Sequence, residues 1–205
     1  MEVAGKPLVR WCLEAFAAAP GVERAVIAAP LGREAELASL APERLAATAV
    51  VGGATRAESV GRALELVDTE LVVVHDAARP LLTPALIETL LARLDSDPEA
   101  TGVIAAAPLT ETVKRVGDDQ VIERTESRAQ LWAAQTPQVF PTEVLLAVHA
   151  ADPERASATD DAMLVERAGG RVLVEPAPGP NLKVTTPDDL RFAALVLGDR
   201  HRESN

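Results

Sequence analysis

The chain alternates short, wholly aliphatic runs with amphipathic stretches of helical spacing, and this alternation restricts its fold more than any other feature. Clear examples of the runs are RAVIAAP (24–30), LVVVH (71–75) and TGVIAAAP (101–108). Strands that are apolar throughout are typical of sheets whose two faces are both covered. Strands separated by helices favour a parallel sheet. The sequence therefore predicts the α/β class, with a mostly parallel sheet and helices on both of its faces.

Periodicity and capping residues predict where the helices begin and end. Residues 8–20 carry apolar side chains at the i, i+3, i+4, i+8 spacing of an amphipathic helix. Thr55 and Glu58 have the spacing of a capping box, which predicts a helix start at this point. Thr83 as a cap with Pro84 at the first helical position predicts another.

Three segments depart from the alternation. Between 109 and 134, polar and β-branched residues alternate around Gly117, which predicts a hairpin that serves as a lid or a dimerisation arm. Residues 198–205 hold no core signal, so we expect a frayed tail. An open α/β sheet normally starts with a strand, whereas this chain starts at a predicted helix. We therefore expect the first strand and its loop to be missing.

Length, charge and composition exclude several classes of partner. At 205 residues the chain suits one domain with a sizeable core. The net charge of −11 and the 2% of aromatic residues argue against nucleic-acid binding, which depends on basic and base-stacking side chains. No apolar run approaches the roughly 18 residues of a membrane span. With no signal-peptide pattern and a single cysteine, Cys12, the chain is expected to be cytoplasmic.

Ligands of parallel sheets bind beyond the carboxyl ends of the strands, and HDAARP (75–80) follows one of the aliphatic runs. Asp76 is suited to hold Mg²⁺ through a hard oxygen, and Arg79 to clamp a phosphate in a bidentate fork. The alternative is an Asp–Arg pair that closes a turn before Pro80. We expect His75 to pack or hydrogen-bond locally, because no nucleophile accompanies it.

Other strand ends carry further candidates. The pair Gly52-Gly53 lets the backbone approach a ligand in front of a helix N-terminus, although an ordinary turn is an equal alternative. Lys183 falls on the same side of an extended segment as Asn181 and Thr185. Thr136 lies among uncharged polar residues able to bind hydroxyls or a base edge. These residues alone indicate a small phosphorylated ligand and leave the reaction open.

In order and spacing, these stretches resemble the 2-C-methyl-D-erythritol 4-phosphate cytidylyltransferases from Ala4 to about Leu190. The segments that carry the resemblance are AGKPLVRWCLEAF, GGATRAESV, HDAARPLLT, PLTETVKR, RAQLWAAQTPQVF, ATDDAMLVERAGG and NLKVTTPDDL. The resemblance implies a single Rossmann-like nucleotidyltransferase domain over 1–205, with the 109–134 arm exchanged across a homodimer. It also implies a reaction of CTP with 2-C-methyl-D-erythritol 4-phosphate that releases pyrophosphate with the help of Mg²⁺. This reaction belongs to isoprenoid precursor synthesis by the methylerythritol phosphate pathway.

The resemblance implies a role for each matching residue. The positions implied to bind the nucleotide are Gly52, Gly53, Arg56, Ser59, Asp76 and Ala77. Those implied to bind methylerythritol phosphate are Asp76, Arg79, Thr112, Arg128, Thr136, Thr159 and Lys183. Asp76 would also hold the metal. Arg128, reaching into the neighbouring subunit, and Lys183 would position the phosphate for in-line attack, a reaction in which positioning and charge neutralisation do most of the catalysis.

One part of the family pattern lies outside this sequence. Family members begin with a strand and a glycine-rich loop whose arginine, with a lysine that follows, neutralises charge on CTP. This chain starts just after that segment, and Lys6 belongs to a later element. Since lost transition-state contacts are costly, we expect weak or absent CTP turnover. Two alternatives remain: a ribitol 5-phosphate cytidylyltransferase, and a non-catalytic partner that binds ligand and dimerises through the arm.

Overall fold

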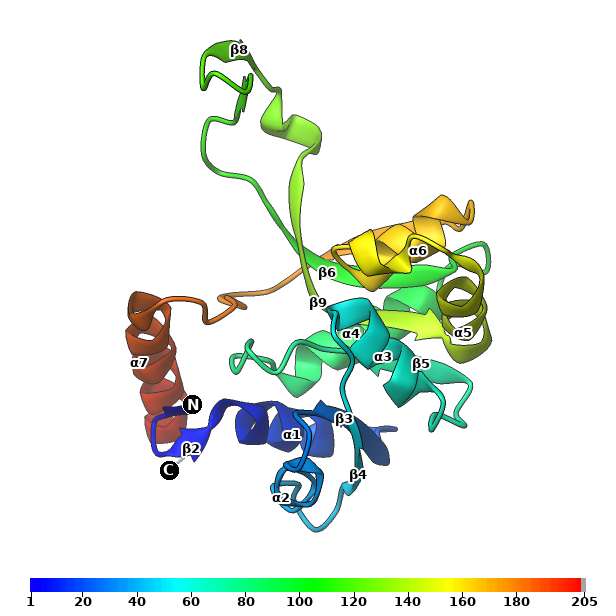
Figure 1. Ribbon diagram of the computed structural model, residues 1–205. Coiled ribbons are helices and arrows are strands. Elements are labelled where there is room, and N and C mark those ends of the chain that lie inside the picture. Colours follow the sequence, from blue (N-terminus) through cyan, green and yellow to red (C-terminus); the bar gives the residue numbers. More distant parts are fainter. Residues whose placement is uncertain (204–205) are drawn as a thin grey trace.

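The computed structural model describes residues 1–203, in which the longer strands form two separate sheets surrounded by helices (Figure 1). The larger sheet has the strand order β10-β6-β9-β5, and the smaller one pairs β3 with β4. The strands of the larger sheet are β5 (Leu71–Val74), β6 (Gly102–Pro108), β9 (Trp132–Pro141) and β10 (Val172–Pro176). Those of the smaller sheet are β3 (Arg24–Ala29) and β4 (Ala46–Val51).

The larger sheet is mixed, and within its described strands only β9 runs against the others. β10 pairs with β6 in parallel, whereas β9 is antiparallel to both β6 and β5. The chain goes from β6 to β9 through the arm without a crossover helix, so β9 returns alongside β6 as in a long hairpin. The α/β class is therefore confirmed, with a mixed rather than a purely parallel sheet.

Helices cover both faces of the larger sheet. The helices of the described chain are α1 (Leu8–Ala18), α2 (Glu34–Ala38), α3 (Arg56–Leu64), α4 (Pro84–Asp95), α5 (Thr142–Ala151), α6 (Asp161–Arg167) and α7 (Pro187–Glu203). Of these, α2 contacts the smaller sheet instead. Side chains of α1 and α4 pack with Val103 and Val139 on one face. Side chains of α3, α5 and α6 pack with Ile104 and Phe140 on the other. The alternating strand residues thus face two different helical layers, as the wholly aliphatic runs predict.

The predicted helix caps are confirmed. Thr55 Oγ1 accepts a hydrogen bond from the Glu58 backbone N–H at 3.1 Å and starts α3. Thr83 Oγ1 accepts from the Leu86 N–H at 3.3 Å, with proline in the first turn of α4. Both caps satisfy a backbone donor that the helix itself leaves free, and α3 is thereby fixed at the edge of the functional site.

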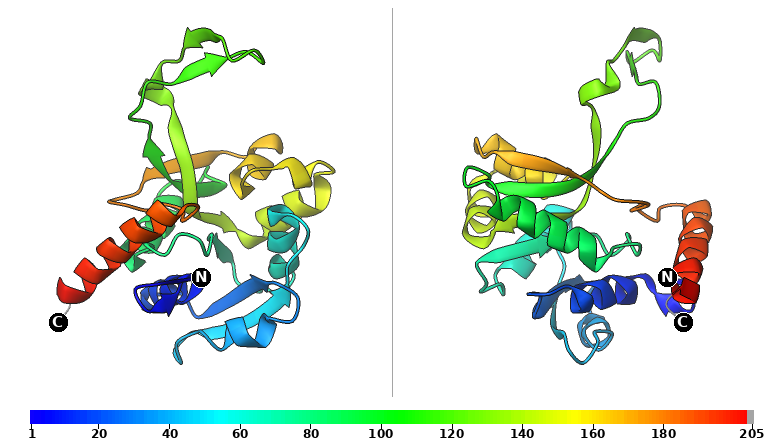
Figure 2. Two further views of the ribbon diagram at one scale, coloured as in Figure 1. Left: turned by 60° about the vertical axis from the view of Figure 1, so that its left-hand side comes forward. Right: turned by 180° about the vertical axis from the view of Figure 1, so that it is seen from behind.

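A large apolar cleft separates the two sheets. It has a volume of about 990 Å³ and is lined by residues of β3 and β5, together with residues of α1 and α3. Among the described strands, β3 pairs only with β4 and β5 only with β9, so the edges that face the cleft make no ladder. The first described strands, β1 (Glu2–Val3) and β2 (Lys6–Pro7), pair with each other instead of joining either sheet, and β1 contacts α7 (Figure 2).

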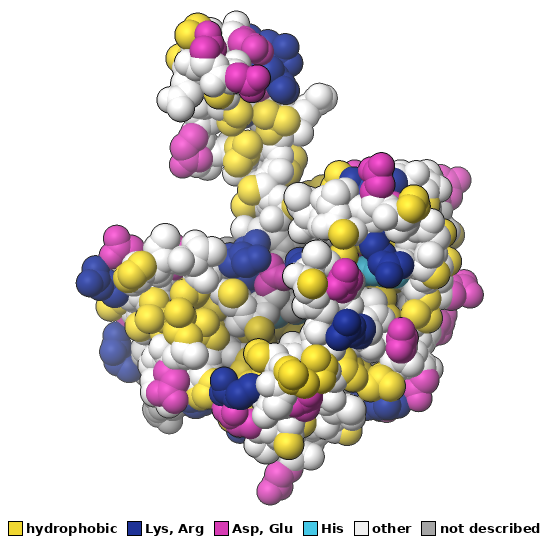
Figure 3. All heavy atoms as spheres, in the orientation of Figure 1, with side chains coloured by type: hydrophobic (Ala, Val, Ile, Leu, Met, Phe, Trp, Pro, Cys, Tyr) yellow, Lys and Arg dark blue, Asp and Glu magenta, His cyan; other side chains and the backbone are white. Residues whose placement is uncertain are grey.

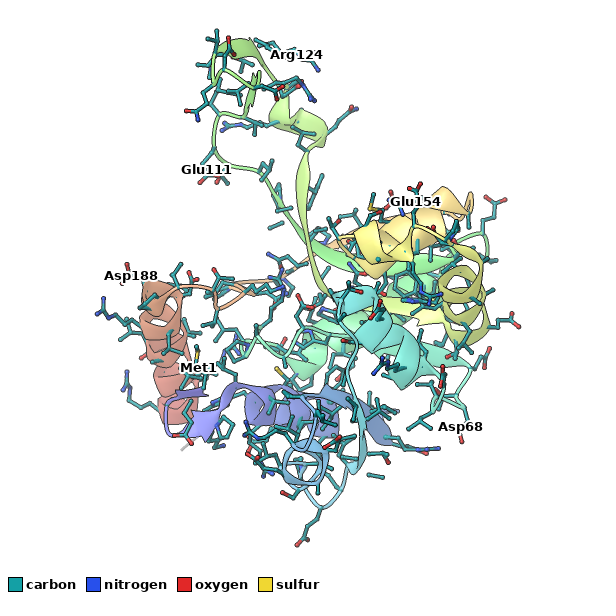
Figure 4. The ribbon with its side chains drawn as sticks, viewed as in Figure 1. Met1, Asp68, Glu111, Arg124, Glu154 and Asp188 are labelled. Atoms are coloured by element: carbon teal, nitrogen blue, oxygen red, sulfur yellow. The ribbon has the colours of Figure 1, made fainter. Side chains whose placement is uncertain are left out.

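The segment between β6 and β9 is an arm that stands away from the rest of the molecule (Figures 1 and 3). Its tip is the predicted hairpin, formed by β7 (Lys114–Val116) and β8 (Ile122–Thr125). The turn is closed by a hydrogen bond from the Gln120 N–H to the Gly117 carbonyl at 2.9 Å. In Figure 4, Glu111 and Arg124 mark the arm and lie far from the sheets.

The expected frayed tail is wrong for residues 198–203, which form the last turns of α7. Leu197 is 3% exposed and packs with Val3, so the helix is anchored just before this segment. Arg200 Nη1 then donates to the Leu81 carbonyl at 3.0 Å. Ser204 and Asn205 lie outside the described residues. No helix in the described part of the chain combines the length and the apolar character needed to cross a bilayer.

Candidate active site

A polar cavity of about 170 Å³ lies at the foot of the arm, where several strand ends meet. The carboxyl end of β5, the start of α3, β9 and two loop segments contribute to its wall. Its lining residues are Arg56, Asp76, Arg79, Ala134, Gln135, Thr136, Gln138, Thr159, Asp160 and Lys183. Lys and Arg side chains appear at the foot of the arm in Figure 3. Six of the predicted site residues are therefore brought together, although four of them are distant in sequence from Asp76 and Arg79.

His75 and Thr136 fix the backbone of the turn that carries Asp76. The Thr136 hydroxyl accepts from the Asp76 N–H at 3.0 Å. It donates to His75 Nδ1, also at 3.0 Å, because the other nitrogen of the neutral ring carries the hydrogen. His75 Nε2 then donates to the Arg79 carbonyl at 3.1 Å. Desolvation lowers the pKa of His75 from 6.5 to about 4, and the imidazole is neutral at pH 7. The prediction that His75 hydrogen-bonds locally is confirmed.

Three cationic side chains converge on the Asp76 carboxylate. Lys183 Nζ lies 3.0 Å from Oδ2, Arg56 Nε 3.2 Å from Oδ1, and Arg79 Nε 3.9 Å from Oδ2. Burial alone would raise the pKa of Asp76, but the hydrogen bond from Lys183 and the charge of Arg56 outweigh it and lower that pKa. The Asp76 carboxylate is therefore ionised at pH 7, and it holds the three cations around one small volume.

The sequence left two alternatives for Asp76 and Arg79, a ligand site and a closed turn before Pro80, and the structure has features of both. The Arg79 N–H bonds to the Asp76 carbonyl at 2.9 Å, which closes a turn before Pro80. The guanidinium does not close that turn tightly, because its Nη1 donates to the Asn181 carbonyl at 2.7 Å and its buried Nε has no hydrogen-bond partner among the described residues. A buried donor without an acceptor is costly. It is available to an anionic ligand.

The segment after β10 reaches the site through Asn181. This side chain is 5% exposed, and its Nδ2 donates to the Thr136 carbonyl at 2.8 Å. Two residues further on, Lys183 points its ammonium group at Asp76. Thr185 was expected on the same side of the segment, but its hydroxyl instead bonds to Asp189 in the first turn of α7 at 2.9 Å.

Four of the lining residues are not among the predicted site residues, and two of them, Gln138 and Asp160, contact each other. Gln138, 1% exposed, donates from Nε2 to Asp160 Oδ2 at 2.9 Å and accepts from the Ala162 N–H at 3.2 Å. These bonds hold the loop that carries Thr159 against β9. The acidic pair at 160–161, directly before an apolar helical run, was the sequence signal for this loop. It does not by itself show which carboxylate faces the cavity.

Several predicted nucleotide-binding residues lie beside the cavity rather than in its wall. Ser59 and Ala77 line the apolar cleft, which Arg56 and Asp76 also contact, so the two spaces adjoin. The Gly53 N–H donates to Ser59 Oγ at 3.0 Å. A Cβ at Gly53 would come within 2.2 Å of the Glu58 Cβ, so this glycine is required by close backbone packing. The same turn places Gly52 next to Ser59.

Thr112 and Arg128 are not among the residues that line the cavity. Both lie on the arm, where Arg128 Nη1 donates to the Thr110 carbonyl. Lys114 and Arg115 also occupy the arm and pair with arm residues. The arm therefore carries two candidate residues away from the cavity that other candidates line.

Asp76 is the residue best placed to bind a divalent cation. Among the described side chains, no three His, Cys, Asp or Glu residues gather as a metal-binding group. Mg²⁺ commonly takes only one or two carboxylates and completes its octahedron with waters and substrate phosphates. Each Asp76 oxygen retains a lone pair beyond the contacts made by Lys183 and Arg56. The donor set fits a cation that arrives together with phosphate ligands.

An α/β fold with a cation-lined cavity at its strand ends is suited to bind a phosphorylated ligand, and comparison with known proteins identifies the class as a nucleotidyltransferase. Residues 1–199 match the family model described as IspD: 2-C-methyl-D-erythritol 4-phosphate cytidylyltransferase. The chain belongs to this family.

Curated relatives and solved structures agree with the family match. A 2-C-methyl-D-erythritol 4-phosphate cytidylyltransferase of Parasynechococcus marenigrum is 41% identical over 99% of this chain and 90% of its own length. The corresponding protein of Deinococcus radiodurans is 40% identical over 97% of this chain and 81% of its own. The crystal structure of the Thermus thermophilus cytidylyltransferase superimposes with a TM-score of 0.79 at 32% identity, covering 96% of this chain and 91% of that one.

Proposed function

We propose that this chain transfers the cytidylyl group of CTP to 2-C-methyl-D-erythritol 4-phosphate, a step of isoprenoid precursor synthesis. The observation that carries the proposal is the convergence of Arg56, Arg79 and Lys183 on Asp76 in a member of this family. A phosphate monoester and a triphosphate repel each other. Cations on one small cavity offset this repulsion and hold both groups in place.

The reaction needs no general base at this site. A phosphate oxygen of methylerythritol phosphate attacks the α-phosphorus of CTP, the bond from that phosphorus to the bridging oxygen breaks, and pyrophosphate leaves with the bonding electrons. The attacking oxygen is ionised at neutral pH. The neutral His75 is consistent with this scheme, because its Nε2 hydrogen is bonded to the Arg79 carbonyl and its Nδ1 to the Thr136 hydroxyl, which leaves neither nitrogen for proton transfer.

Each side chain then has a defined task. Lys183, the most exposed of the three cations, holds the incoming sugar phosphate, and the buried Nε of Arg79 offers it a second donor. The nucleotide occupies the side of Arg56 that adjoins Ser59 and the cleft. Asp76 would hold Mg²⁺ together with CTP, and the cation would neutralise charge on the phosphates.

The proposal includes a homodimer formed through the arm. Large apolar side chains on the arm are exposed: Val116 at 52%, Val121 at 60%, Ile122 at 58% and Trp132 at 39%. Apolar surface of this kind on a projecting hairpin is typical of an interface. Packing against a second copy would cover it and bring Arg128 and Thr112 to that copy's cavity.

The dimer is tested by sedimentation velocity of the Ile122→Glu variant. We expect the wild-type chain to sediment as a dimer and Ile122→Glu as a monomer. Leu31→Glu is the matched control, because Leu31 is 82% exposed and lies outside the arm. A monomeric wild-type chain, or equal dissociation of both variants, would contradict a dimer through the arm.

The proposal places the protein in the cytoplasm. Cys12 is buried, and its Sγ lies 3.6 Å from the Leu8 and Arg79 carbonyls. Burial raises the pKa of its thiol to about 12, so the side chain acts as a packed apolar group. With one buried cysteine, the chain has no internal disulfide to form in an oxidising compartment.

Phosphorus NMR under single-turnover conditions tests the reaction itself. With Mg²⁺, CTP and excess protein, methylerythritol phosphate should give the cytidine diphosphate sugar alcohol and pyrophosphate, even if turnover is slow. Ribitol 5-phosphate is the competing substrate, and the better rate with it would overturn the choice of acceptor. Binding of both substrates without any pyrophosphate would instead support a non-catalytic role.

A further inference from the structure

A buried acid–imidazole pair lies behind Arg56, on the side away from the cavity. Asp161 is 1% exposed and His149 is 5% exposed, and neither lines the cavity. His149 Nε2 is 2.9 Å from Asp161 Oδ1, and Asp161 Oδ2 is 2.7 Å from Arg56 Nη1. Since a carboxylate only accepts, His149 Nε2 carries the hydrogen of this bond. The pair comes from α5 and α6, and Arg56 from α3.

Arg56 is thus held from two sides by two carboxylates with different surroundings. Asp76 holds Nε and faces the cavity, where ligands arrive. Asp161 holds Nη1 and is closed off from solvent. Burial alone would lower the pKa of Arg56, and the charges of Asp161 and Asp76 outweigh it, so that pKa is raised.

The third nitrogen of the Arg56 guanidinium, Nη2, remains available to a ligand. Arg56 Nη2 is buried, yet it has no hydrogen-bond partner among the described residues. Nε is hydrogen-bonded to Asp76 and Nη1 is ion-paired with Asp161, and these two contacts limit where the planar guanidinium can aim Nη2. Arg56 lines both the cavity and the cleft, so the side chain that carries this donor lies where the two spaces adjoin.

We propose that Asp161, oriented by His149, is a positioning residue that aims Arg56 Nη2 at the nucleotide. When phosphate groups or a cation engage Asp76, the contact between Asp76 and Arg56 weakens, and Asp161 alone keeps the guanidinium in place. The identity of the ligand rests on the proposed function, whereas the positioning of Arg56 rests on the geometry alone.

Arg56 NMR signals test the positioning without any substrate. In the wild-type protein, the fixed guanidinium should give separate Nη resonances, because rotation about its Nε–Cζ bond is slow. The Asp161→Asn variant keeps the shape of the side chain and removes its charge, and we expect these resonances to broaden and merge. Unchanged, separate Arg56 resonances in Asp161→Asn would overturn the inference.

Titration calorimetry of substrate binding provides the functional test. Loss of a close charge contact corresponds to about a 10- to 100-fold change in affinity, so Asp161→Asn should raise the Kd for CTP by that factor. The Kd for methylerythritol phosphate should stay within about twofold. In an Arg56→Ala background, Asp161→Asn should have no further effect on the Kd for CTP. An equal loss in that background would show that Asp161 does not act through Arg56.

Two control variants separate positioning from folding. Leu164→Ala destabilises the same helix, α6, from its buried face without touching Arg56, and it should leave the Kd for CTP unchanged. His149→Gln keeps a donor for Asp161 and should bind CTP almost normally, whereas His149→Phe should resemble Asp161→Asn. If Leu164→Ala weakens CTP binding as much as Asp161→Asn does, the role of Asp161 is structural. Should wild-type protein fail to bind CTP, the proposed function fails, and the Arg56 resonances still decide this inference.

Discussion

The two sheets of this molecule differ sharply in how completely they are enclosed. In β6 and β9 of the larger sheet, five side chains have no exposed surface: Val103, Ala105, Ala106, Val139 and Phe140. In β3 only Ala29 is buried, and every residue of β4 retains some exposure. Sheets of two strands are marginal by themselves, and here one edge of the pair borders an apolar cleft.

This difference in burial between the two sheets indicates where the fold can hold charged groups in fixed positions. The groups around Asp76 are held by the larger sheet and by the helices that cover it. Arg56 pairs with Asp161 on α6, and the Asp76 N–H bonds to Thr136 on β9. β5 shares both environments, because it pairs with β9 on one side and borders the cleft on the other. The polar site therefore begins where the well-packed region ends.

The largest effect on activity is expected for Lys183→Ala, which tests whether the site at the larger sheet holds the acceptor phosphate. Loss of a preorganised charge contact costs about 10² to 10³ in rate, so we expect kcat/KM for methylerythritol phosphate to fall by that factor. The Kd for CTP should change little. Lys6→Ala is the matched control, because Lys6 pairs with Glu14 outside the cavity. Equal weakening of CTP binding in Lys183→Ala would contradict the separation of the two subsites.

His75, at the end of β5 in the larger sheet, should make the free energy of unfolding depend on pH in the acid range. Its pKa is about 4 in the folded chain and near 6.5 when unfolded, so the unfolded state binds more protons between these values. The free energy of unfolding should therefore decrease by up to about 1.4 kcal/mol for each pH unit below 6.5, until about pH 4. Urea titrations of wild type and His75→Gln from pH 4 to 7 measure this. If both have the same slope, the assignment to His75 is wrong.

The same substitution should have opposite effects in the two regions. Ala105 in β6 has no exposed surface, and Ala105→Leu should destabilise by about 1–3 kcal/mol through overpacking. Ala63 of α3 faces the cleft, and Ala63→Leu should stabilise by about 0.5–1 kcal/mol by covering apolar surface. Thermal unfolding of both variants measures the contrast. Destabilisation by both would show that the cleft is as tightly packed as β6.

The smallest effect is expected for the ion pair that spans the cleft. Arg24 of β3 lies 2.6 Å from Asp68, which precedes β5, but their side chains are 48% and 71% exposed. Exposed pairs contribute little, so Asp68→Asn should change the free energy of unfolding by less than about 0.5 kcal/mol. A loss above 1 kcal/mol in urea titrations would mean that this pair helps to hold the two sheets together.

The local elements could be predicted from the sequence because their signals are local. Capping by Thr55 and Thr83 depends on residues three positions away, and the aliphatic runs mark the strands directly. The strand-end rule also located Asp76 and Arg79, because it needs only the end of β5. The position of Lys183 in the same cavity was predicted by resemblance and by the pattern of its own segment.

Long-range features could not be obtained in this way. An apolar run looks the same in a parallel and in an antiparallel central strand, so the direction of β9 follows only from its connection through the arm. The contacts of Asp161 with His149 and Arg56 depend on how three helices pack on one sheet face. Residues 198–203 carry no core signal of their own and stay helical because Leu197 and Arg200 anchor the helix.

Hydrogen–deuterium exchange tests the central claim, that the well-packed larger sheet carries the substrate site. We predict slow exchange in β6 and β9 and faster exchange in β3 and β4. Addition of CTP and methylerythritol phosphate with Mg²⁺ should slow exchange at 75–79, 135–138 and 181–185. Equal protection of both sheets, together with no ligand effect on these three segments, would contradict the account.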